Sequence, residues 1–409
     1  MTPSAGSSAD VRLESNQPEI SSPSPNENRI KILHIINDLS IGGAEMMLYR
    51  LLSQKGHNRF DSVVISLMDR GSLRNRIEGL GIRVYSPKMR QGLPTVASIW
   101  RLIRLVRQIN PDLIQGWLYH GSLAGQIGSL AMAQRVPVLW SIHFSIYSLS
   151  FEKKLTATVV RLCAHLSRLA AGIIFVSRTS KVQHEQLGFD ISKSLVFPNG
   201  IDADDFAPSE DARRSVRSEL GLSQDAVLIG NISRYHTMKD HPNFLRAAAL
   251  ITKRYPEVKF FLAGRYLDAS NRTLIEMIHE GGLDDHVSLL GERLDIARLV
   301  AALDIFCLSS SYGESFPLIV GEAMSSGVPC VVTDVGDSSW MVNGTGRVVP
   351  PRDAGALASA CIDLLEMGPE GRTSLGSAAR NRVVGLFSLK TVVSEYEALY
   401  EKIVALKRQ

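Results

Sequence analysis

The chain has 409 residues and a mass of 44.9 kDa, too long for one compact core, because single cores stop growing near about 250–300 residues. Hydrophobic residues make up 45% and charged residues 21%, so a largely disordered chain and a coiled coil are excluded. The net charge of +4 hides an uneven distribution: residues 1–28 carry −3, residues 29–199 carry +13 and residues 200–409 carry −6.

Residues 1–28 are rich in Ser, Pro and Asn and lack an apolar run, which predicts a disordered tail rather than a signal peptide. No stretch of 18 consecutive apolar residues follows, so we expect no transmembrane helix. The four cysteines show no metal-ligand spacing, and three of them stand in apolar runs. We therefore expect buried, reduced thiols in a cytoplasmic protein.

From residue 29 the sequence alternates short apolar runs with amphipathic stretches. The apolar runs predict strands at residues 30–37, 63–67, 113–116, 138–142, 173–176 and 195–197. Helical spacing predicts helices at residues 44–52, 96–108, 123–133 and 152–171. Apolar strands that alternate with helices favour a parallel sheet covered on both faces.

Pro198-Asn199-Gly200 and the aspartates after it predict a linker, because turn formers and clustered acids interrupt the alternation. The alternation then restarts with strands at 227–232, 259–263, 287–290, 305–308 and 329–333 and helices at 243–254 and 271–280. We therefore predict two doubly wound α/β domains with Rossmann-like parallel sheets, over residues 29–199 and 200–388. A carboxy-terminal helix over 389–409 is expected to pack back on the first domain. Ligands of such sheets bind beyond the carboxyl ends of the strands, so we expect the site between the domains.

The loop after the first strand contains Gly42 and Gly43 directly before a helix. Two glycines let a ligand approach the backbone closely, and a helix amino terminus presents N–H groups to it. The pattern is not G-x-G-x-x-G, which disfavours a dinucleotide-dependent dehydrogenase. A tight strand-to-helix turn explains the same glycines without a ligand.

Arg234 and Lys239 stand five residues apart in the loop after the strand at 227–232. Two cations at the carboxyl end of a strand are suited to hold a diphosphate, the arginine through a bidentate fork and the lysine as a point charge. Two solvated loop cations are the alternative interpretation of this pair.

The sharpest pattern is Glu314-Ser315-Phe316-Pro317-Leu318-Ile319-Val320-Gly321-Glu322, which follows the strand at 305–308. We expect Ser315 to cap a helix that has Pro317 in its first turn. Glu322 then lies two turns inside an otherwise apolar helix. A carboxylate so placed needs a partner, such as ligand hydroxyls, unless that helix face is exposed.

His143 ends the strand at 138–142, where a histidine can contact a substrate, although a lone histidine after a strand more often has a structural role. His120 has a similar but weaker claim. Asp202-Ala203-Asp204 has the D-x-D form of metal-dependent transferases, but its place in the linker indicates a solvated acidic turn. No cluster of His, Cys and Asp predicts a bound metal.

Together these patterns resemble the retaining glycosyltransferases of family 4, which have the GT-B fold, from about residue 30 to the carboxy terminus. The most specific element is the E-x7-E motif of Glu314 and Glu322. The other matches are Gly42-Gly43-Ala44-Glu45, Phe197-Pro198-Asn199-Gly200-Ile201-Asp202, Arg234 with Lys239, and Thr333-Asp334-Val335-Gly336-Asp337. The set looks most like bacterial enzymes of exopolysaccharide, capsule or O-antigen (lipopolysaccharide) synthesis.

The resemblance implies a role for each matching residue. Arg234 and Lys239 match the cations on the donor diphosphate, and Glu322 matches the acid that holds the nucleotide ribose. The remaining matches are the loop near the diphosphate (Gly42, Gly43), a histidine near the reacting sugar (His143), the segment beside the base (Arg293, in the loop 291–294) and the segment around the donor hexose (Glu314, Ser315, Phe316, Pro317, Leu318). The implied catalytic residues are Glu314, His143, Arg234 and Lys239. Many members have Gly in place of Ser315 and Glu in place of Trp340, so contacts of the loop around Trp340 are not carried over.

The resemblance also implies a reaction. We predict transfer of a hexose or N-acetylhexosamine from a nucleotide sugar, expected to be UDP-linked, to a lipid-linked or growing polysaccharide acceptor, without metal or cofactor. No nucleophile is evident opposite the donor, so we favour front-face attack with retention of configuration. One alternative is a GT-B phosphorylase or epimerase, although no pyridoxal lysine or further phosphate site of a phosphorylase is visible. The other is a non-catalytic sugar-nucleotide-binding subunit, which the intact Arg234, Lys239, Glu314 and Glu322 disfavour.

The basic residues 29–199 form the acceptor half in this resemblance. Arg101, Arg104 and Arg107 recur beside Trp100, and further cations occur over 152–171. Each cation near an anionic membrane surface contributes about 1 kcal/mol, so we expect peripheral binding to the cytoplasmic membrane. A solvated helix face explains either helix alone. Nucleic acid is not expected as a partner.

Overall fold

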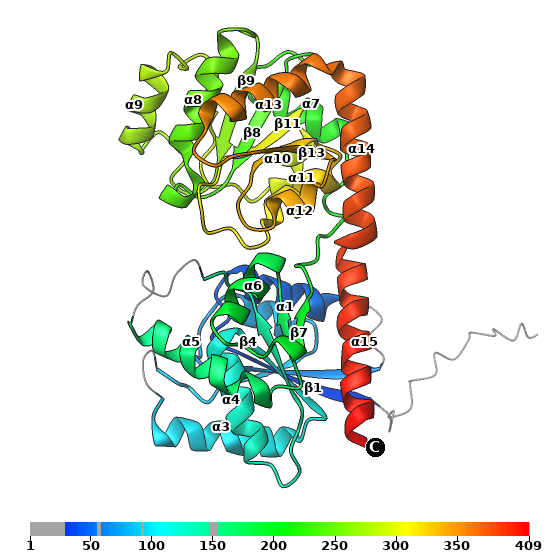
Figure 1. Cartoon of the computed structure of the whole chain (residues 1–409). Helices are drawn as coiled ribbons and strands as arrows, with labels where there is room; N and C mark the ends of the chain where they lie inside the picture. Colours follow the sequence, from blue (N-terminus) through cyan, green and yellow to red (C-terminus); the bar gives the residue numbers. More distant parts are fainter. Residues whose placement is uncertain (1–28, 55–58, 91–93, 147–153, 409) are drawn as a thin grey trace, which may run out of the picture.

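The computed structural model describes residues 29–54, 59–90, 94–146 and 154–408; the tail expected over residues 1–28 lies outside this part. Two parallel sheets form two lobes, one above the other in Figure 1. The predicted fold class, two doubly wound α/β domains, is confirmed. All four cysteines are buried and free of disulfides, as expected from their apolar surroundings.

The sheet of the first domain has seven strands in the order β3-β2-β1-β4-β5-β6-β7. These strands are β1 (Ile30–Ile36), β2 (Phe60–Ser66), β3 (Arg83–Tyr85), β4 (Leu113–Trp117), β5 (Val138–Ile142), β6 (Gly172–Phe175) and β7 (Ser194–Val196). Its helices are α1 (Gly43–Ser53), α2 (Leu73–Glu78), α3 (Val96–Ile109), α4 (Leu118–Leu130), α5 (Lys154–Leu166) and α6 (Arg178–Gln186). Apolar side chains of α3, α4 and α5 pack on one face, and those of α1, α2 and the carboxy-terminal helix on the other.

The sheet of the second domain has six strands in the order β10-β9-β8-β11-β12-β13. These strands are β8 (Leu228–Ile232), β9 (Lys259–Ala263), β10 (Val287–Leu289), β11 (Ile305–Leu308), β12 (Cys330–Thr333) and β13 (Gly346–Val349). Helices α8 (His241–Thr252), α9 (Arg272–Glu280) and α13 (Ala354–Glu366) cover one face. The other face is covered by α7 (Glu210–Glu219), α10 (Ile296–Ala301), α11 (Leu318–Ser325), α12 (Ser338–Val342) and α14 (Gly368–Leu386).

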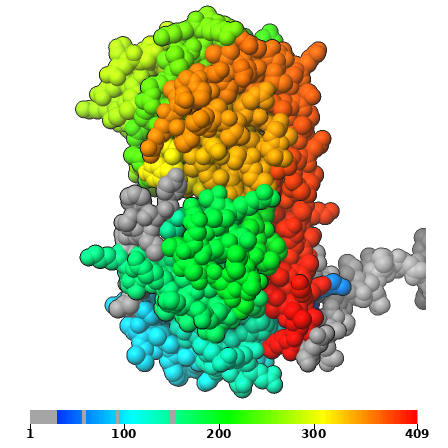
Figure 2. All heavy atoms as spheres, viewed as in Figure 1, coloured from blue at the N-terminus to red at the C-terminus, as the bar shows by residue number. Residues whose placement is uncertain are grey.

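The chain crosses between the domains twice at one place. Ile201 in the linker pairs with Ser388 in a parallel bridge, and its N–H donates to the carbonyl of Phe387 at 2.8 Å. The helix α15 (Leu389–Arg408) then runs along the first domain, so that α14 and α15 form a column beside both lobes (Figures 1 and 2). The apolar side chains that α15 buries in the core of the first domain are Leu389, Val392, Val393, Tyr396, Tyr400, Ile403 and Val404.

The strand order reverses once in each sheet. In the first domain the reversal lies between β1 and β4, and in the second it lies between β8 and β11. Loops diverge to opposite faces at such a reversal, which leaves a crevice at the carboxyl edge where ligands of doubly wound sheets bind. The loops that follow β1, β4, β8 and β11 are therefore the first places to look for a site.

Candidate active site between the two domains

Lys239 and Glu314 meet at the carboxyl edge of the second sheet. Lys239 follows β8 and Glu314 follows β11, and Nζ of Lys239 lies 2.5 Å from Oε1 of Glu314. The hydroxyl of Ser310 donates to the same carboxylate oxygen at 2.5 Å. The two side chains are only 14% and 8% exposed, so the ion pair is largely shielded from water.

Backbone contacts join the two loops that carry this pair. The hydroxyl of Ser309 donates to the carbonyl of Lys239 at 2.8 Å, and the N–H of Ser311 donates to the carbonyl of Met238 at 2.8 Å. Asp240 has a left-handed φ of +48° and caps α8 with its side chain, which turns the chain directly after Lys239. The ammonium of Lys239 is thus held at the crevice by backbone geometry.

Arg234 lies in the same loop but makes no ion pair within the described part of the chain. Its side chain is exposed, and its guanidinium approaches only the sulfur of Met238, at 3.9 Å. Because Lys239 is paired with Glu314 while Arg234 is not, the loop presents the unpaired guanidinium of Arg234. An anionic ligand is the natural partner for such a loop.

Glu322 is buried on α11, and its partner comes from the first domain. Nη2 of Arg50 on α1 lies 3.4 Å from Oε1 of Glu322, and Nη1 of Arg50 donates to the carbonyl of Gly200 in the linker at 3.2 Å. Burial raises the pKa of Glu322, and the charge and hydrogen bond of Arg50 oppose this rise. The need for a partner, predicted from sequence, is met by an arginine 272 residues away.

The predicted cap of α11 is wrong. The helix begins at Leu318, with Pro317 at the capping position and no side-chain cap, so Ser315 lies outside the first turn. The hydroxyl of Ser315 instead lies 2.9 Å from that of Ser177, across the domain boundary. Phe316 packs into the core of the second domain, which leaves the backbone of this segment, rather than its apolar side chains, to face a ligand.

Gly42 and Gly43 lie at the reversal point of the first sheet, where α1 begins. Neither glycine has a positive φ, and a Cβ placed on Gly43 would meet no atom within 4 Å. A Cβ on Gly42 would meet only the flexible side chain of Glu45. The fold itself therefore does not demand glycine here, which favours the interpretation that a ligand approaches this backbone.

His143 follows β5 and has unsatisfied ring nitrogens. Both nitrogens are shielded from solvent and lack a hydrogen-bond partner in the described chain, as does Oδ1 of the buried Asn199. The ring stacks on Trp117, with centroids 5.1 Å apart. Burial lowers the pKa of His143 to about 3, so the imidazole is neutral at physiological pH. Buried polar atoms without partners are rare, and these two are suited to ligand hydroxyls.

Three other candidates are engaged elsewhere. The guanidinium of Arg293 donates to the carboxylates of Asp295 and Glu219, in a network on its own domain. His120 begins α4 and lies 3.4 Å from the amide nitrogen of Asn37, with a pKa lowered by burial. The side chain of Asp202 accepts from the next backbone N–H groups, as expected for an acidic turn. Among the described residues, no group of three or more His, Cys, Asp and Glu side chains could hold a metal ion.

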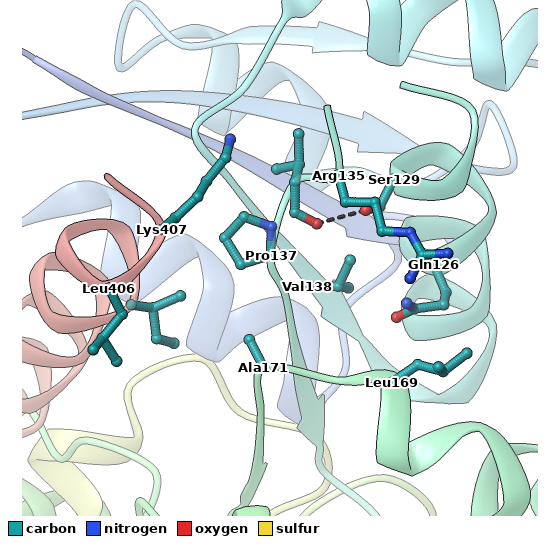
Figure 3. A pocket seen from close by; sticks show the side chains of 11 residues that line it. Gln126, Ser129, Arg135, Pro137, Val138, Leu169, Ala171, Leu406 and Lys407 are labelled. Carbon is teal, nitrogen blue, oxygen red and sulfur yellow. Dashed lines mark hydrogen bonds between the residues drawn. The ribbon is translucent and has the colours of Figure 1, made fainter. Parts of the chain in front are cut away.

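A cavity of about 340 Å³ lies away from these residues. It opens where β5 begins, between the end of α4 and the end of α15, and Figure 3 shows Gln126, Arg135 and Lys407 on its walls. Since β5 begins at the edge opposite its carboxyl end, the cavity is not part of the site described above.

Sequence reasoning missed the residues that reach across the boundary. Arg50 stands inside a helix without a motif. Thr179 stands in α6, a helix that was not predicted, and Ser177 directly precedes that helix. Asp337, which accepts from the backbone of α6, belongs to a recognised segment but had no assigned contact. Only its place after an apolar strand, at the ligand edge, could have singled it out.

Comparisons with known proteins identify the family. Residues 41–205 match the profile described as Glycosyltransferase Family 4, and residues 224–367 match the profile described as Glycosyl transferases group 1. EpsF of Bacillus subtilis, a proposed glycosyltransferase, is 28% identical over 328 residues, covering 76% of this chain and 80% of that one. The Escherichia coli UDP-Gal:alpha-D-GlcNAc-diphosphoundecaprenol alpha-1,3-galactosyltransferase is 23% identical over 389 residues, covering 93% and 99%.

Solved structures agree on the fold. HepE of Anabaena in complex with UDP has a TM-score of 0.79 at 24% identity, covering 91% of this chain and 100% of that one. A glycosyltransferase from Rickettsia africae has a TM-score of 0.78 at 18% identity, covering 92% and 99%. With both profiles matched in order over its two domains, the chain belongs to the family 4 glycosyltransferases and has the GT-B fold.

Proposed function

We propose that this glycosyltransferase moves a hexose or N-acetylhexosamine from a UDP-linked donor to a lipid-linked or growing polysaccharide acceptor, with retention of configuration. The observation that carries the proposal is the convergence of Arg234, Lys239 and Glu314 at the reversal point of the second sheet. HepE was solved with UDP and with UDP-glucose, and the E. coli relative is named for UDP-Gal and a diphosphoundecaprenol acceptor. These names support the choice of donor and acceptor.

In this proposal Arg234 and Lys239 hold the donor diphosphate. Arg234 has no carboxylate partner in the described chain, so an ion pair with phosphate costs it no existing bond. Lys239 is shared between Glu314 and the phosphate. As the sugar–phosphate bond breaks, negative charge grows on the leaving phosphate, and two cations already in position stabilise it. They supply the charge that a divalent ion supplies in metal-dependent transfer, so we propose a metal-independent reaction.

We propose front-face attack on the donor sugar. Glu314 is already bonded to Lys239 and to Ser310, which makes its carboxylate a poor nucleophile. The acceptor oxygen instead bonds to the anomeric carbon on the face from which the phosphate departs, and the phosphate takes the acceptor proton. The neutral imidazole of His143 contributes a hydrogen bond to a sugar hydroxyl rather than a proton.

The diphosphate assignment is tested by Arg234→Ala. Because Arg234 makes no ion pair in the described chain, its loss should leave the thermal midpoint unchanged. We expect kcat/KM for the UDP-sugar to fall about 100-fold, since removing one group that stabilises a transition-state charge costs roughly 3 kcal/mol. The exposed Arg246 on α8 provides the control, and Arg246→Ala should retain wild-type kinetics. Full activity of Arg234→Ala would contradict the assignment.

We further propose that the first domain binds an anionic membrane through α3, α4 and α5. These three helices contain no Asp or Glu, and they cover one face of the sheet (Figure 1). Trp100 is 60% exposed with Arg104 over its ring, and Leu155 and Leu162 are about half exposed. Exposed apolar groups among cations are typical of interfacial helices. None of the helices that the structure describes is both long and apolar enough to span a bilayer.

Liposome sedimentation tests this surface. The wild-type chain should sediment with phosphatidylglycerol vesicles at low salt and release at high salt, because charge attraction is screened. Replacing Arg101, Arg104 and Arg107 with Gln should weaken binding roughly 100-fold, since three cations at about 1 kcal/mol each contribute about 3 kcal/mol. Replacing the exposed cations Arg246, Lys253 and Arg272 of the second domain removes the same charge and should change binding little. Equal losses from both sets would contradict a specific face.

A further inference from the structure

The amino terminus of α6, in the first domain, is capped by a carboxylate of the second domain. Asp337, which precedes α12 and is 3% exposed, accepts from the N–H of Arg178 at 2.6 Å. Its other oxygen accepts from the N–H and the hydroxyl of Thr179, at 2.9 and 2.7 Å. The first N–H groups of a helix lack intrahelical partners and carry partial positive charge, so a carboxylate is stabilised there. No cation pairs with Asp337 among the described residues.

Asp337 also holds the segment around Glu314. Its own N–H donates to the carbonyl of Ser315 at 3.0 Å, and the hydroxyl of Ser315 lies 2.9 Å from that of Ser177, the residue before α6. Gly336 has a φ of +61°, and a Cβ there would lie 2.5 Å from the carbonyl oxygen of Glu314. The backbone at Gly336 and Asp337 therefore packs directly against the backbone of Glu314 and Ser315.

A second contact runs beside the first. The guanidinium of Arg178 lies over the ring of Trp340, 4.2 Å from its centroid. Trp340 in turn packs edge-on against Phe316, with centroids 6.1 Å apart. In Figure 2 the surface of the first domain around α6 (green) lies against that of the second domain (orange). The start of α6 thus reaches the segment 314–316 by two routes, one polar and one aromatic.

We propose that Asp337 is a positioning residue that couples the approach of the two domains to the arrangement of the Glu314–Ser315 segment. The inference rests on the proposed function, in which this segment surrounds the donor hexose. With the domains together, α6 binds Asp337 and Ser315 and holds the segment against Lys239. With the domains apart, α6 keeps only its own Ser177 cap, and the contacts of Asp337 with Arg178 and Thr179 and the support of Ser315 are lost. The site is complete only when α6 is in contact.

The variant Asp337→Asn tests the proposal from the second domain. It retains the shape of the side chain but loses its charge and one of its acceptor oxygens. We expect kcat to fall roughly tenfold or more, because hydrogen bonds to a charged group are among the stronger ones. The affinity for UDP, which lacks the hexose, should stay within about threefold, since Arg234 and Lys239 are intact. Asp334→Asn, an exposed residue of the same loop, is the matched control and should match the wild-type chain.

Thr179 tests the same contact from the first domain. Thr179→Val removes only the hydroxyl that donates to Asp337 and should lower kcat, whereas Thr179→Ser retains the hydroxyl and should preserve it. The double variant Asp337→Asn/Thr179→Val should be no worse than Asp337→Asn alone, because both changes break one contact. Losses that multiply in the double variant would contradict a shared contact.

Small-angle X-ray scattering gives a readout that needs no substrate. We expect the radius of gyration of Asp337→Asn to exceed that of the wild-type chain and of Asp334→Asn. An unchanged radius together with wild-type kcat would overturn the proposal. If the wild-type chain transfers no sugar but the Asp337→Asn variant has a larger radius of gyration, the proposed function is contradicted while the domain contact through Asp337 is supported.

Discussion

At the scale of single residues, charges at the domain boundary are paired across long stretches of sequence. Glu322 pairs with Arg50, and Arg50 also holds the carbonyl of Gly200 in the linker. Buried charges require partners, so the sequence pattern around Glu322 indicated a partner, such as ligand hydroxyls, unless the helix face was exposed. It could not identify Arg50, because nothing in an isolated helix sequence indicates which domain it will face.

The variant Arg50→Met should change how donor binding depends on pH. Burial raises the pKa of Glu322 and Arg50 counteracts this, so without Arg50 the pKa rises further and the carboxylate is protonated at a higher pH. If the ionised form holds the ribose, UDP affinity falls on acidification, and the midpoint of the fall should lie at higher pH in the variant. Calorimetric titration with UDP from pH 8 to pH 5 measures this. A midpoint shared with Arg246→Met would contradict it.

The pair Lys239–Glu314 allows stability to be separated from activity. Lys239→Met leaves Glu314 shielded from water with only Ser310 as a partner. The free energy of unfolding should therefore fall by up to about 3–5 kcal/mol, and the thermal midpoint should fall with it. Adding Glu314→Gln removes the unpaired charge and should restore much of the midpoint. Transfer activity should stay absent in both. A double variant that regains activity would show that neither side chain is needed for catalysis.

At the scale of elements, the sequence predicted most strands closely but placed some helix starts wrongly. Residues 138–142 and 259–263 are strands with the predicted bounds. Helix α4 begins at Leu118, five residues before the predicted start, because Leu118 takes a positive φ and turns the chain directly into the helix. Gly121 contributes to the error because glycine is a weak helix former. The structure requires glycine there, since a Cβ would lie 2.3 Å from the carbonyl oxygen of Ile35.

The helix α15 should be essential to the first domain. Its seven buried apolar side chains cover one face of a sheet that belongs to residues 30–196. Exposing them costs about 1.5–3 kcal/mol each, and the total of roughly 10–20 kcal/mol equals or exceeds the whole stability of a typical domain. A chain ending at Ser388 should therefore unfold without cooperativity and bind hydrophobic dyes. A sharp urea transition of the truncated chain would contradict this.

At the scale of the whole molecule, the uneven charge of the sequence corresponds to one face of the first domain. The sequence predicted a basic first domain, and the structure gathers exposed apolar and basic side chains on α3, α4 and α5. Amphipathic periodicity predicted the exposed face of α3. That α3 and α5 lie on the same side of the sheet follows from the crossover connections, which no local pattern contains.

Acid should destabilise the whole molecule. Burial lowers the pKa of His143 to about 3 and those of His184 and His241 to about 4, from an ordinary value of 6.5. Below pH 6.5 the unfolded chain binds protons that the folded chain does not, so the unfolding free energy falls by about 1.4 kcal/mol per pH unit for each histidine until pH 4. Urea unfolding from pH 7 to pH 5 measures the slope. His184→Gln should flatten it and the exposed His279→Gln should not.

The most direct test of the central claim is the stereochemistry of transfer. The chain is incubated in EDTA with an α-linked UDP-hexose and a polyprenyl-diphosphate-linked sugar acceptor, and the anomeric configuration of the product is read by NMR. We predict acceptor-dependent release of UDP and an α-linked product. A β-linked product would contradict retention. If no nucleotide is released from any of the UDP-, GDP-, ADP- and dTDP-sugars in a panel, the proposed transfer itself is contradicted.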